Sequence, residues 1–216
     1  MAFNDNIKRY GFSRSVGAWG LRKLERHLGL HIWVIDLRPT DSAYKIPEEH
    51  AAQFTFKRLT LNEAVASSAN EQLGMSADFV RDAFSRSDVC LGVLHGDKLV
   101  AYAWRTFKRA PVTNDLWIRL CRDDVRYGYK AYVLPEYRGM QLYQSVTQFY
   151  EHEFAAMGIN NAVGYTALNN LPSMRSRTTY STQVKIGYAG FLKLGARYWT
   201  FRTPGVRAYL AFDRSR

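Results

Sequence analysis

The sequence predicts an α/β fold with a mixed, mostly antiparallel central sheet, flanking helices and an N-terminal extension. Short apolar runs of strand length alternate with helical patterns along residues 51–216. Between residues 127 and 168, a strand, a loop, a long helix and another strand follow one another, which is the order of a βαβ unit. With 47% hydrophobic and 23% charged residues, the chain has a globular composition.

Residues 1–50 are predicted to form an extension that precedes a domain of residues 51–216. Within the extension, Ser15–Leu28 has the period of a helix, Ile32–Leu37 that of a short strand, and a linker with two prolines follows. Three leucines of the helix fall on one face: Leu21, Leu24 and Leu28. The helix is basic and could lie on a membrane surface, but packing of its leucines against its own domain is the simpler expectation.

Local signals place several elements of the domain. Thr60 with Glu63 predicts a capping box, and Ser76 predicts the N-cap of a second helix. His95-Gly96-Asp97-Lys98 predicts the turn of a hairpin. The other expected elements are strands at Gln53–Leu59, Val89–Leu94, Leu99–Phe107, Trp117–Cys121, Tyr127–Leu134 and Asn161–Leu168, a helix at Leu142–Met157, and a C-terminal hairpin of Ala196–Phe201 with Arg207–Phe212.

The formal net charge of +11 is concentrated at the two ends of the chain. Residues 1–30 carry six Lys and Arg against two acidic residues, and residues 160–216 carry nine against one. Such an excess attracts polyanions: nucleic acid, anionic lipid or a phosphorylated cofactor. Nucleic acid is compatible with this charge but not favoured, because core and sheet packing explains most of the tyrosines.

Several classes of protein are disfavoured. No apolar run approaches the ~20 residues of a membrane-crossing helix, and the first ten residues lack a signal-peptide core. Cys90 and Cys121 are interpreted as reduced thiols, so a cytoplasmic protein is expected. No metal site is expected, because Gly29 interrupts the spacing between His27 and His31.

The segment Ala131–Leu142 carries the chemistry. A strand enters a turn that is bounded by Pro135, and Arg138-Gly139 precedes a helix. The first N–H groups of a helix have no intrahelical partner, and together with the helix dipole they favour a bound anion. Gly139 lets the backbone approach that anion, and Arg138 adds a positive charge. A diphosphate fits this arrangement.

The run Val133-x-Pro135-x-Tyr137-Arg138-Gly139 before a long helix resembles the coenzyme A pyrophosphate-binding segment of the Gcn5-related N-acetyltransferase (GNAT) superfamily. Asn170-x-x-Ser173 and Lys185-x-Gly187-Tyr188 resemble its later helix and closing motif. The resemblance covers about residues 51–216. It implies that a primary amine attacks the thioester of acetyl-CoA or another acyl-CoA directly.

The resemblance also implies roles for individual residues. The strand Tyr129–Leu134 would polarise the thioester carbonyl through a main-chain N–H, and Tyr180 would be the general acid, with a packing role as the alternative. The implied cofactor-binding residues are Val133, Leu134, Arg138, Gly139, Met140, Gln141, Leu142, Tyr143 and Asn170.

Two positions depart from the pattern of the superfamily, which usually has Arg/Gln-x-x-Gly-x-Gly/Ala in this loop. Gln141 stands in place of the second glycine, and Tyr143 in place of the small final residue. Either the loop keeps its shape with both side chains pointing away, or the affinity for the cofactor is reduced. In the position where the superfamily often has its tyrosine, this chain has Gln183, one helical turn after Tyr180.

Three functions are compatible with the sequence. The first is acyl-CoA-dependent N-acyltransfer, the second is a related transferase with a longer acyl donor or an aminoacyl-tRNA, and the third is a non-catalytic module for RNA or an anionic membrane. Ser173–Thr182, with two arginines among hydroxyl groups, could bind a phosphate or carboxylate of the acceptor, or be a solvated loop. A homodimer is compatible with all three.

Overall fold

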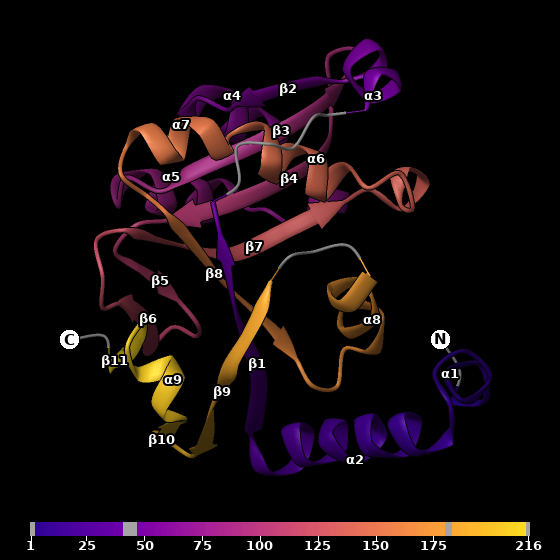
Figure 1. The fold of residues 1–216 in the computed structure, drawn as a ribbon, viewed down its shortest axis with the longest axis vertical. Coiled ribbons are helices and arrows are strands. Elements are labelled where there is room, and N and C mark those ends of the chain that lie inside the picture. Colours follow the sequence, from indigo (N-terminus) through magenta and orange to yellow (C-terminus); the bar gives the residue numbers. More distant parts are fainter. Residues whose placement is uncertain (1–2, 41–46, 180–182, 215–216) are drawn as a thin grey trace. The chain divides into compact units, whose positions relative to one another are not determined.

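The computed structural model describes residues 3–40, 47–179 and 183–214, and the chain divides into two compact units. The first unit comprises Met1–Pro39, Pro111–Arg122 and Val163–Arg216, and the second comprises Thr40–Ala110 and Asp123–Ala162. Figure 1 labels the helices and strands along the chain. Each unit is therefore assembled from segments that are distant in sequence.

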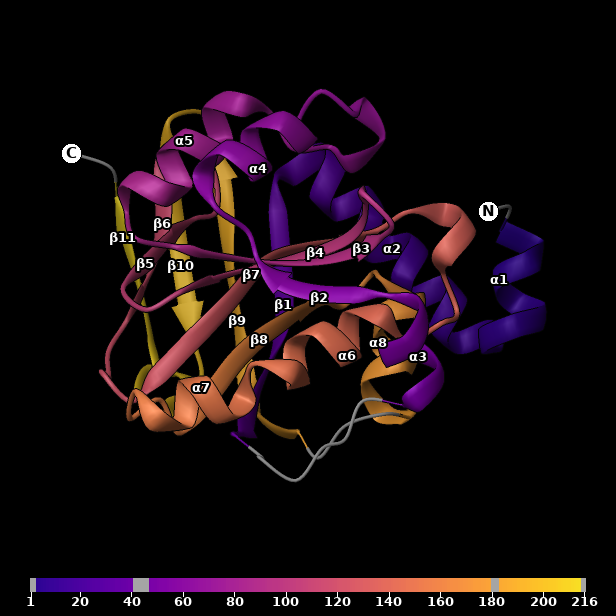
Figure 2. The ribbon, with the colours of Figure 1, turned by 90° about the horizontal axis from the view of Figure 1, so that it is seen from above.

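The second unit contains the strands β2, β3, β4 and β7 in this order, each antiparallel to its neighbour. Their bounds are Thr55–Arg58, Val89–His95, Lys98–Thr106 and Val125–Val133. Helices α4 (Leu61–Ser67) and α5 (Ala77–Ser85) lie on one face (Figure 2). Helices α6 (Leu142–Phe149) and α7 (Glu151–Ala156) lie on the other. The core of the unit is thus enclosed between two helical layers.

The remaining elements of the second unit are short. They are α3 (Glu48–Gln53), η1 (Glu71–Leu73) and η2 (Pro135–Tyr137). Strand β5 (Arg109–Pro111) lies where the chain changes from the second unit to the first.

The local signals in the second unit are confirmed. Thr60 and Glu63 form both bonds of the capping box, and Ser76 accepts the N–H of Phe79 at the start of α5. The hydrogen bond from Lys57, with those from Thr60, lowers the pKa of Glu63 to about 2. The hairpin between β3 and β4 also forms at the expected place.

The long helix expected at Leu142–Met157 is wrong, because two helices occupy this segment. Tyr150, with φ −97° and ψ 6°, ends α6 and begins α7. The break turns Glu151 inward, where its carboxylate forms a fully buried ion pair with Arg126 at the start of β7. Arg126 also donates to the hydroxyl of Thr40 at 2.8 Å. This network attaches α7 to β7.

The first unit has the strand order β8, β1, β9 and β10, and both pairs that involve β9 are antiparallel. A separate antiparallel pair joins β6 to β11. The strand bounds are β1 Leu30–Pro39, β6 Leu116–Leu120, β8 Asn161–Ala167, β9 Val184–Leu194, β10 Arg197–Arg202 and β11 Leu210–Arg214. The helices are α1 Phe3–Tyr10, α2 Phe12–Leu28, α8 Leu171–Thr179 and α9 Pro204–Arg207.

The first unit differs from the expected elements in two places. The C-terminal hairpin does not form, since β10 pairs with β9 and β11 pairs with β6. Pro204 begins the short helix α9 between them, a position that suits its fixed φ. Strand β9 has no counterpart among the expected elements, because glycines at 187 and 190 interrupt its pattern. Residues 171–179 form α8, the helix that the resemblance of Asn170-x-x-Ser173 implies, so this part of Ser173–Thr182 is not a loop.

The packing face of α2 also differs from the expected one. Ser15 and Ala18 are buried, whereas Leu24 and Leu28 are exposed. Small side chains allow this helix to approach its neighbours β1, β9 and α8 closely. Gly29, in the left-handed conformation with φ 63°, ends the helix as expected. In the described part of the chain, every helix is too short or too polar to cross a bilayer.

The fold class expected from the sequence is confirmed: the strands pair in mostly antiparallel fashion, and helices flank them. Cys90 is a buried free thiol and Cys121 an exposed one. Burial raises the pKa of Cys90.

Replacing Glu151 by Gln is expected to lower the free energy of unfolding by about 3 kcal/mol, because it removes the buried carboxylate that faces the charge of Arg126. Urea denaturation measures this loss. Glu153→Gln is the matched control, since Glu153 lies on the same helix but its ion pair with Arg58 is exposed, and a change below about 0.5 kcal/mol is expected. Equal losses of unfolding free energy in the two variants would contradict the stabilising role of the buried ion pair.

Candidate functional site

Strand β7 leads directly into the candidate site. The N–H of Leu134 donates to the carbonyl of Val100 on β4, 2.9 Å away, and the Leu134 side chain is fully buried. Main-chain groups of successive strand residues point in opposite directions, so the N–H groups of Ala131 and Val133 point away from β4. On that side, Nε of Arg138 donates to the carbonyl of Val133 at 3.3 Å. The main-chain groups of the last residues of β7 therefore point alternately toward β4 and away from it.

The turn after β7 is attached to the β3–β4 hairpin. The hydroxyl of Tyr137 and Nδ1 of His95 are hydrogen-bonded at 2.9 Å, and Glu136 forms an ion pair with Lys98 at 3.1 Å. A main-chain hydrogen bond and the one from Lys98 lower the pKa of Glu136. Tyr137 and Met140 also pack against the core. The turn is thus held in place by side-chain contacts with the β3–β4 hairpin and with the core.

The backbone of the turn presents several N–H groups together. Gly139 has φ +90°, and Gln141, the N-cap of α6, is left-handed with φ 55° and ψ 21°. Among the residues that the structure describes, no main-chain carbonyl accepts from the N–H groups of Gly139, Met140, Gln141 or Leu142. Successive N–H groups of this kind before a helix form a concave binding site for an anion.

The space beside Gly139 is open. A Cβ atom placed on Gly139 would meet no atom within 4 Å, so neither Gln141 nor Tyr143 fills that space. Gln141 is exposed, and Tyr143 is 43% exposed. The loop therefore keeps an open backbone although it lacks the second glycine and the small final residue of the superfamily pattern.

Arg105 places a buried positive charge beneath the first turn of α6. Its guanidinium carbon lies 5.8 Å from the ring centre of Tyr143, and it donates to the hydroxyl of Thr147 at 2.8 Å. Thr147 in turn donates to the carbonyl of Tyr143 at 2.7 Å. Arg105 was missed by sequence reasoning, because it lies in a hydrophobic strand that gives no sign of its partners on α6.

A bulge in β7 lies shortly before the turn. Trp104 on β4 opposes Lys130, but the next residue, Arg105, opposes Gly128, so Tyr129 is the extra residue. A bulge increases the local twist of a strand and changes the direction of the residues after it. Burial lowers the pKa of the neighbouring Lys130, whose ammonium lies 4.5 Å from the ring centre of Phe79.

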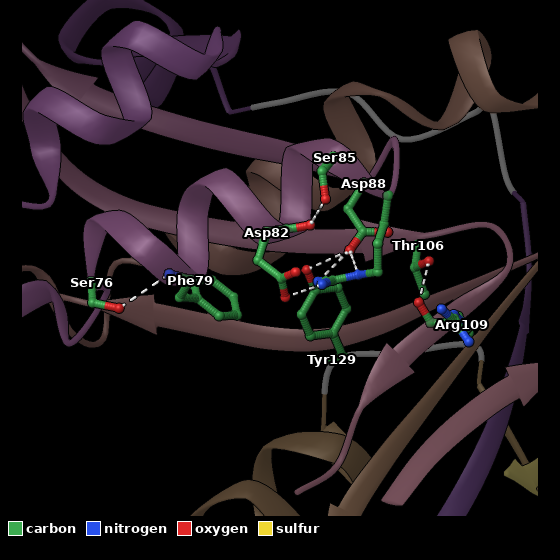
Figure 3. Close-up of polar contacts among 9 residues, drawn as sticks. Ser76, Phe79, Asp82, Ser85, Asp88, Thr106, Arg109 and Tyr129 are labelled. Atoms are coloured by element: carbon green, nitrogen blue, oxygen red, sulfur yellow. Dashed lines mark hydrogen bonds and ion pairs between the residues drawn. The ribbon is translucent and has the colours of Figure 1, made fainter. Parts of the chain in front are cut away.

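Figure 3 shows the contacts that hold the bulge. The hydroxyl of Tyr129 donates to Oδ2 of Asp88 at 2.9 Å, and the same oxygen accepts from Arg86. Burial raises the pKa of Asp88, although Arg86 opposes this shift, and it also raises the pKa of Tyr129. The network connects β7 to the end of α5 and the start of β3. Only the tertiary fold brings these residues together, so no spacing in the sequence indicates them.

The site residues predicted from the sequence do not all lie in the same unit. Val133 to Tyr143 lie together in the second unit, but the side chains of Leu134 and Leu142 are buried in its core, so only their main chain is available. Asn170 belongs to the first unit, where its Oδ1 accepts the N–H of Ser173 as the cap of α8. Tyr180 lies outside the described residues.

The left-handed Gln141 gives a test of the turn. Gln141→Gly is expected to raise the free energy of unfolding by about 0.5–1 kcal/mol, because it removes the backbone strain, whereas Gln141→Val is expected to lower it by at least about 1 kcal/mol. Urea denaturation measures both. Gln144→Gly, inside α6, is the control and should cost about 1 kcal/mol. If Gln141→Gly lost as much stability as the control, the left-handed conformation of Gln141 would be wrong.

Comparisons with known proteins concern the fold. No protein-family model matches the chain, and no curated protein matches it either. Among solved structures, a Drosophila protein is 15% identical with a TM-score of 0.51, over 86% of this chain and 58% of that chain. A putative acetyltransferase of the GNAT family from Novosphingobium aromaticivorans is 12% identical with a TM-score of 0.49, over 87% of this chain and 66% of that chain.

The glucosamine-6-phosphate N-acetyltransferase from Arabidopsis thaliana is 15% identical with a TM-score of 0.41, over 61% of this chain and 95% of that chain. The chain spans less than two thirds of the length of the Drosophila and Novosphingobium proteins. At these identities the similarity is one of fold. That fold is the mixed α/β type, with mostly antiparallel strands, which the resemblance to the Gcn5-related N-acetyltransferase superfamily implies.

Proposed function

We propose that the chain is a GNAT-type N-acyltransferase, within residues 51–216, that transfers an acetyl or other acyl group from acyl-CoA to a primary amine. The observation that carries the proposal is the open turn before α6, where the N–H groups from Gly139 to Leu142 lack main-chain acceptors in the described part of the chain. Four such donors with the start of a helix favour the binding of an anion such as a diphosphate.

Positive side chains support the same assignment. Arg138 is exposed at the edge of the turn, and the buried Arg105 lies under the first turn of α6. Both charges favour an anion at this position. Met140, Leu142 and Leu134 would contribute through the backbone that their buried or half-buried side chains hold in place. Gln141 and Tyr143 would border the diphosphate from the solvent side.

The end of β7 would bind the pantetheine arm. The N–H of Val133 points away from β4, and its carbonyl already accepts a hydrogen bond on that side. An amide of the arm can pair with these groups as a strand would. Asn170 remains a predicted contact of the arm through its amide nitrogen, because its oxygen caps α8.

In the proposed reaction the neutral amine of the acceptor attacks the thioester carbonyl. A C–N bond forms, the C–S bond breaks, and the thiolate of CoA takes up a proton while the amine loses one. A main-chain N–H of β7 would stabilise the negative charge that develops on the carbonyl oxygen. Tyr180 remains the predicted donor of the proton to the thiolate. The hydrogen bond between Tyr129 and Asp88 would keep the strand in position, and neither residue would touch the reacting atoms.

Acetyl-CoA is expected to bind with measurable heat in a calorimetric titration, and Arg138→Glu is expected to weaken binding at least about 10-fold, because it puts a negative charge beside the diphosphate. Arg81→Glu is the matched control: Arg81 is an exposed arginine of the same unit whose partner is Asp78 on α5, and its variant should bind as the unmodified chain does. Pantetheine, which lacks the diphosphate, should bind at least about 10-fold more weakly than CoA.

The absence of heat with acetyl-CoA and with longer acyl-CoA would overturn the proposal, as would equal binding of CoA and pantetheine. Titrations with acetyl-, hexanoyl- and palmitoyl-CoA also distinguish acetyl transfer from transfer of a longer acyl chain. If the chain bound no acyl-CoA but did bind an aminoacyl-tRNA, it would instead be a related transferase that uses the aminoacyl-tRNA as donor.

A further inference from the structure

The net charge of the chain resides in one of its two units. The first unit carries 18 Lys and Arg against 5 Asp and Glu, a formal charge of +13. The second unit carries 12 against 14, a formal charge of −2. The turn proposed to bind the cofactor lies in the second unit, so a diphosphate there does not account for the excess of the first. A localised positive charge of this size attracts anionic partners.

Helix α2 presents an exposed apolar stripe on a side that differs from its packing face. Phe12 is 66% exposed, Val16 39% and Trp19 51%. Positions 12, 16 and 19 recur at intervals of four and three, so they share one face of the helix, while the buried Ser15 and Ala18 lie on another. Leu24 and Leu28 are exposed as well, but they lie on a different face of α2.

Basic residues border this stripe. Arg22, Lys23 and Arg26 are all exposed, and the ammonium of Lys23 lies 5.5 Å from the ring centre of Trp19. Lys8, Arg9 and Arg14 add further charge at the N-terminal end of α2 and on α1. Aromatic and aliphatic side chains with lysines and arginines beside them are the pattern of helices that lie in the plane of a membrane interface.

We propose that the outer face of α2 docks on an anionic lipid bilayer. Phe12, Val16 and Trp19 enter the boundary between headgroups and acyl chains, and Arg22, Lys23 and Arg26 contact lipid phosphates. Nucleic acid fits this face less well, because Val16 can neither stack on bases nor form hydrogen bonds with them. The inference does not depend on the function proposed for the turn.

The test is co-sedimentation of the full chain with vesicles of phosphatidylcholine alone and of phosphatidylcholine mixed with phosphatidylglycerol. Binding is expected only to the mixed vesicles, and it should weaken as salt is added. Trp19→Ser is expected to reduce it at least about 10-fold. Trp199→Ser is the matched control, because Trp199 on β10 is also 51% exposed and belongs to the same unit, and it should leave binding unchanged.

Phe12→Ser, at the most exposed position of the stripe, provides a second variant should Trp19→Ser fail to fold, and Lys23→Glu with Arg26→Glu tests the charges. Equal binding by Trp19→Ser and Trp199→Ser overturns the proposal, and so does equal binding to both kinds of vesicle. Binding of a single-stranded RNA oligonucleotide, with no binding to either kind of vesicle, also overturns it. Arg138→Glu should bind the mixed vesicles normally, and Trp19→Ser should bind acetyl-CoA normally, so the two proposals fail separately.

Discussion

Pro135 has no N–H group to donate, and the ladder between β7 and β4 therefore stops at Leu134. The chain turns at this point, and the residues on either side of the proline fix the geometry of the turn. Before it, the Leu134 side chain is fixed in the core. After it, Tyr137 is tied to His95, and Met140 packs inward. The backbone around Gly139 is left facing solvent, and it is this backbone that offers hydrogen-bond donors to an anion.

Structure that depends on neighbouring residues could be predicted from the sequence. The capping box at Thr60, the cap at Ser76 and the end of α2 at Gly29 each involve atoms within a few residues. The Arg-Gly turn before α6 belongs to the same category, since proline, glycine and a helix start are adjacent in the chain. For this reason the sequence alone was sufficient to locate most of the candidate site.

Features that depend on distant residues could not be predicted in this way. The helix is interrupted at Tyr150, and the next residue, Glu151, pairs with Arg126 on a different element. Strand β9 tolerates its glycines because Gly190 is covered by the ring of Phe201 on β10, in a space that no side chain could share. The positive φ of Gln141 could not be predicted from the sequence either, since glutamine has no preference for that conformation. Arg105, Tyr129 and Asp88 contribute to the site only through tertiary contacts.

At the end of β7, the carbonyl of Val133 already accepts a hydrogen bond from the side chain of Arg138. In the proposed complex, an amide of the pantetheine arm replaces the guanidinium at this carbonyl, while the guanidinium moves to a phosphate. Such an exchange leaves the number of hydrogen bonds at the carbonyl unchanged, so it contributes little net free energy. The protein's selectivity for its cofactor would then reside mainly in the diphosphate, and fragments that carry only the arm would compete poorly with the arginine.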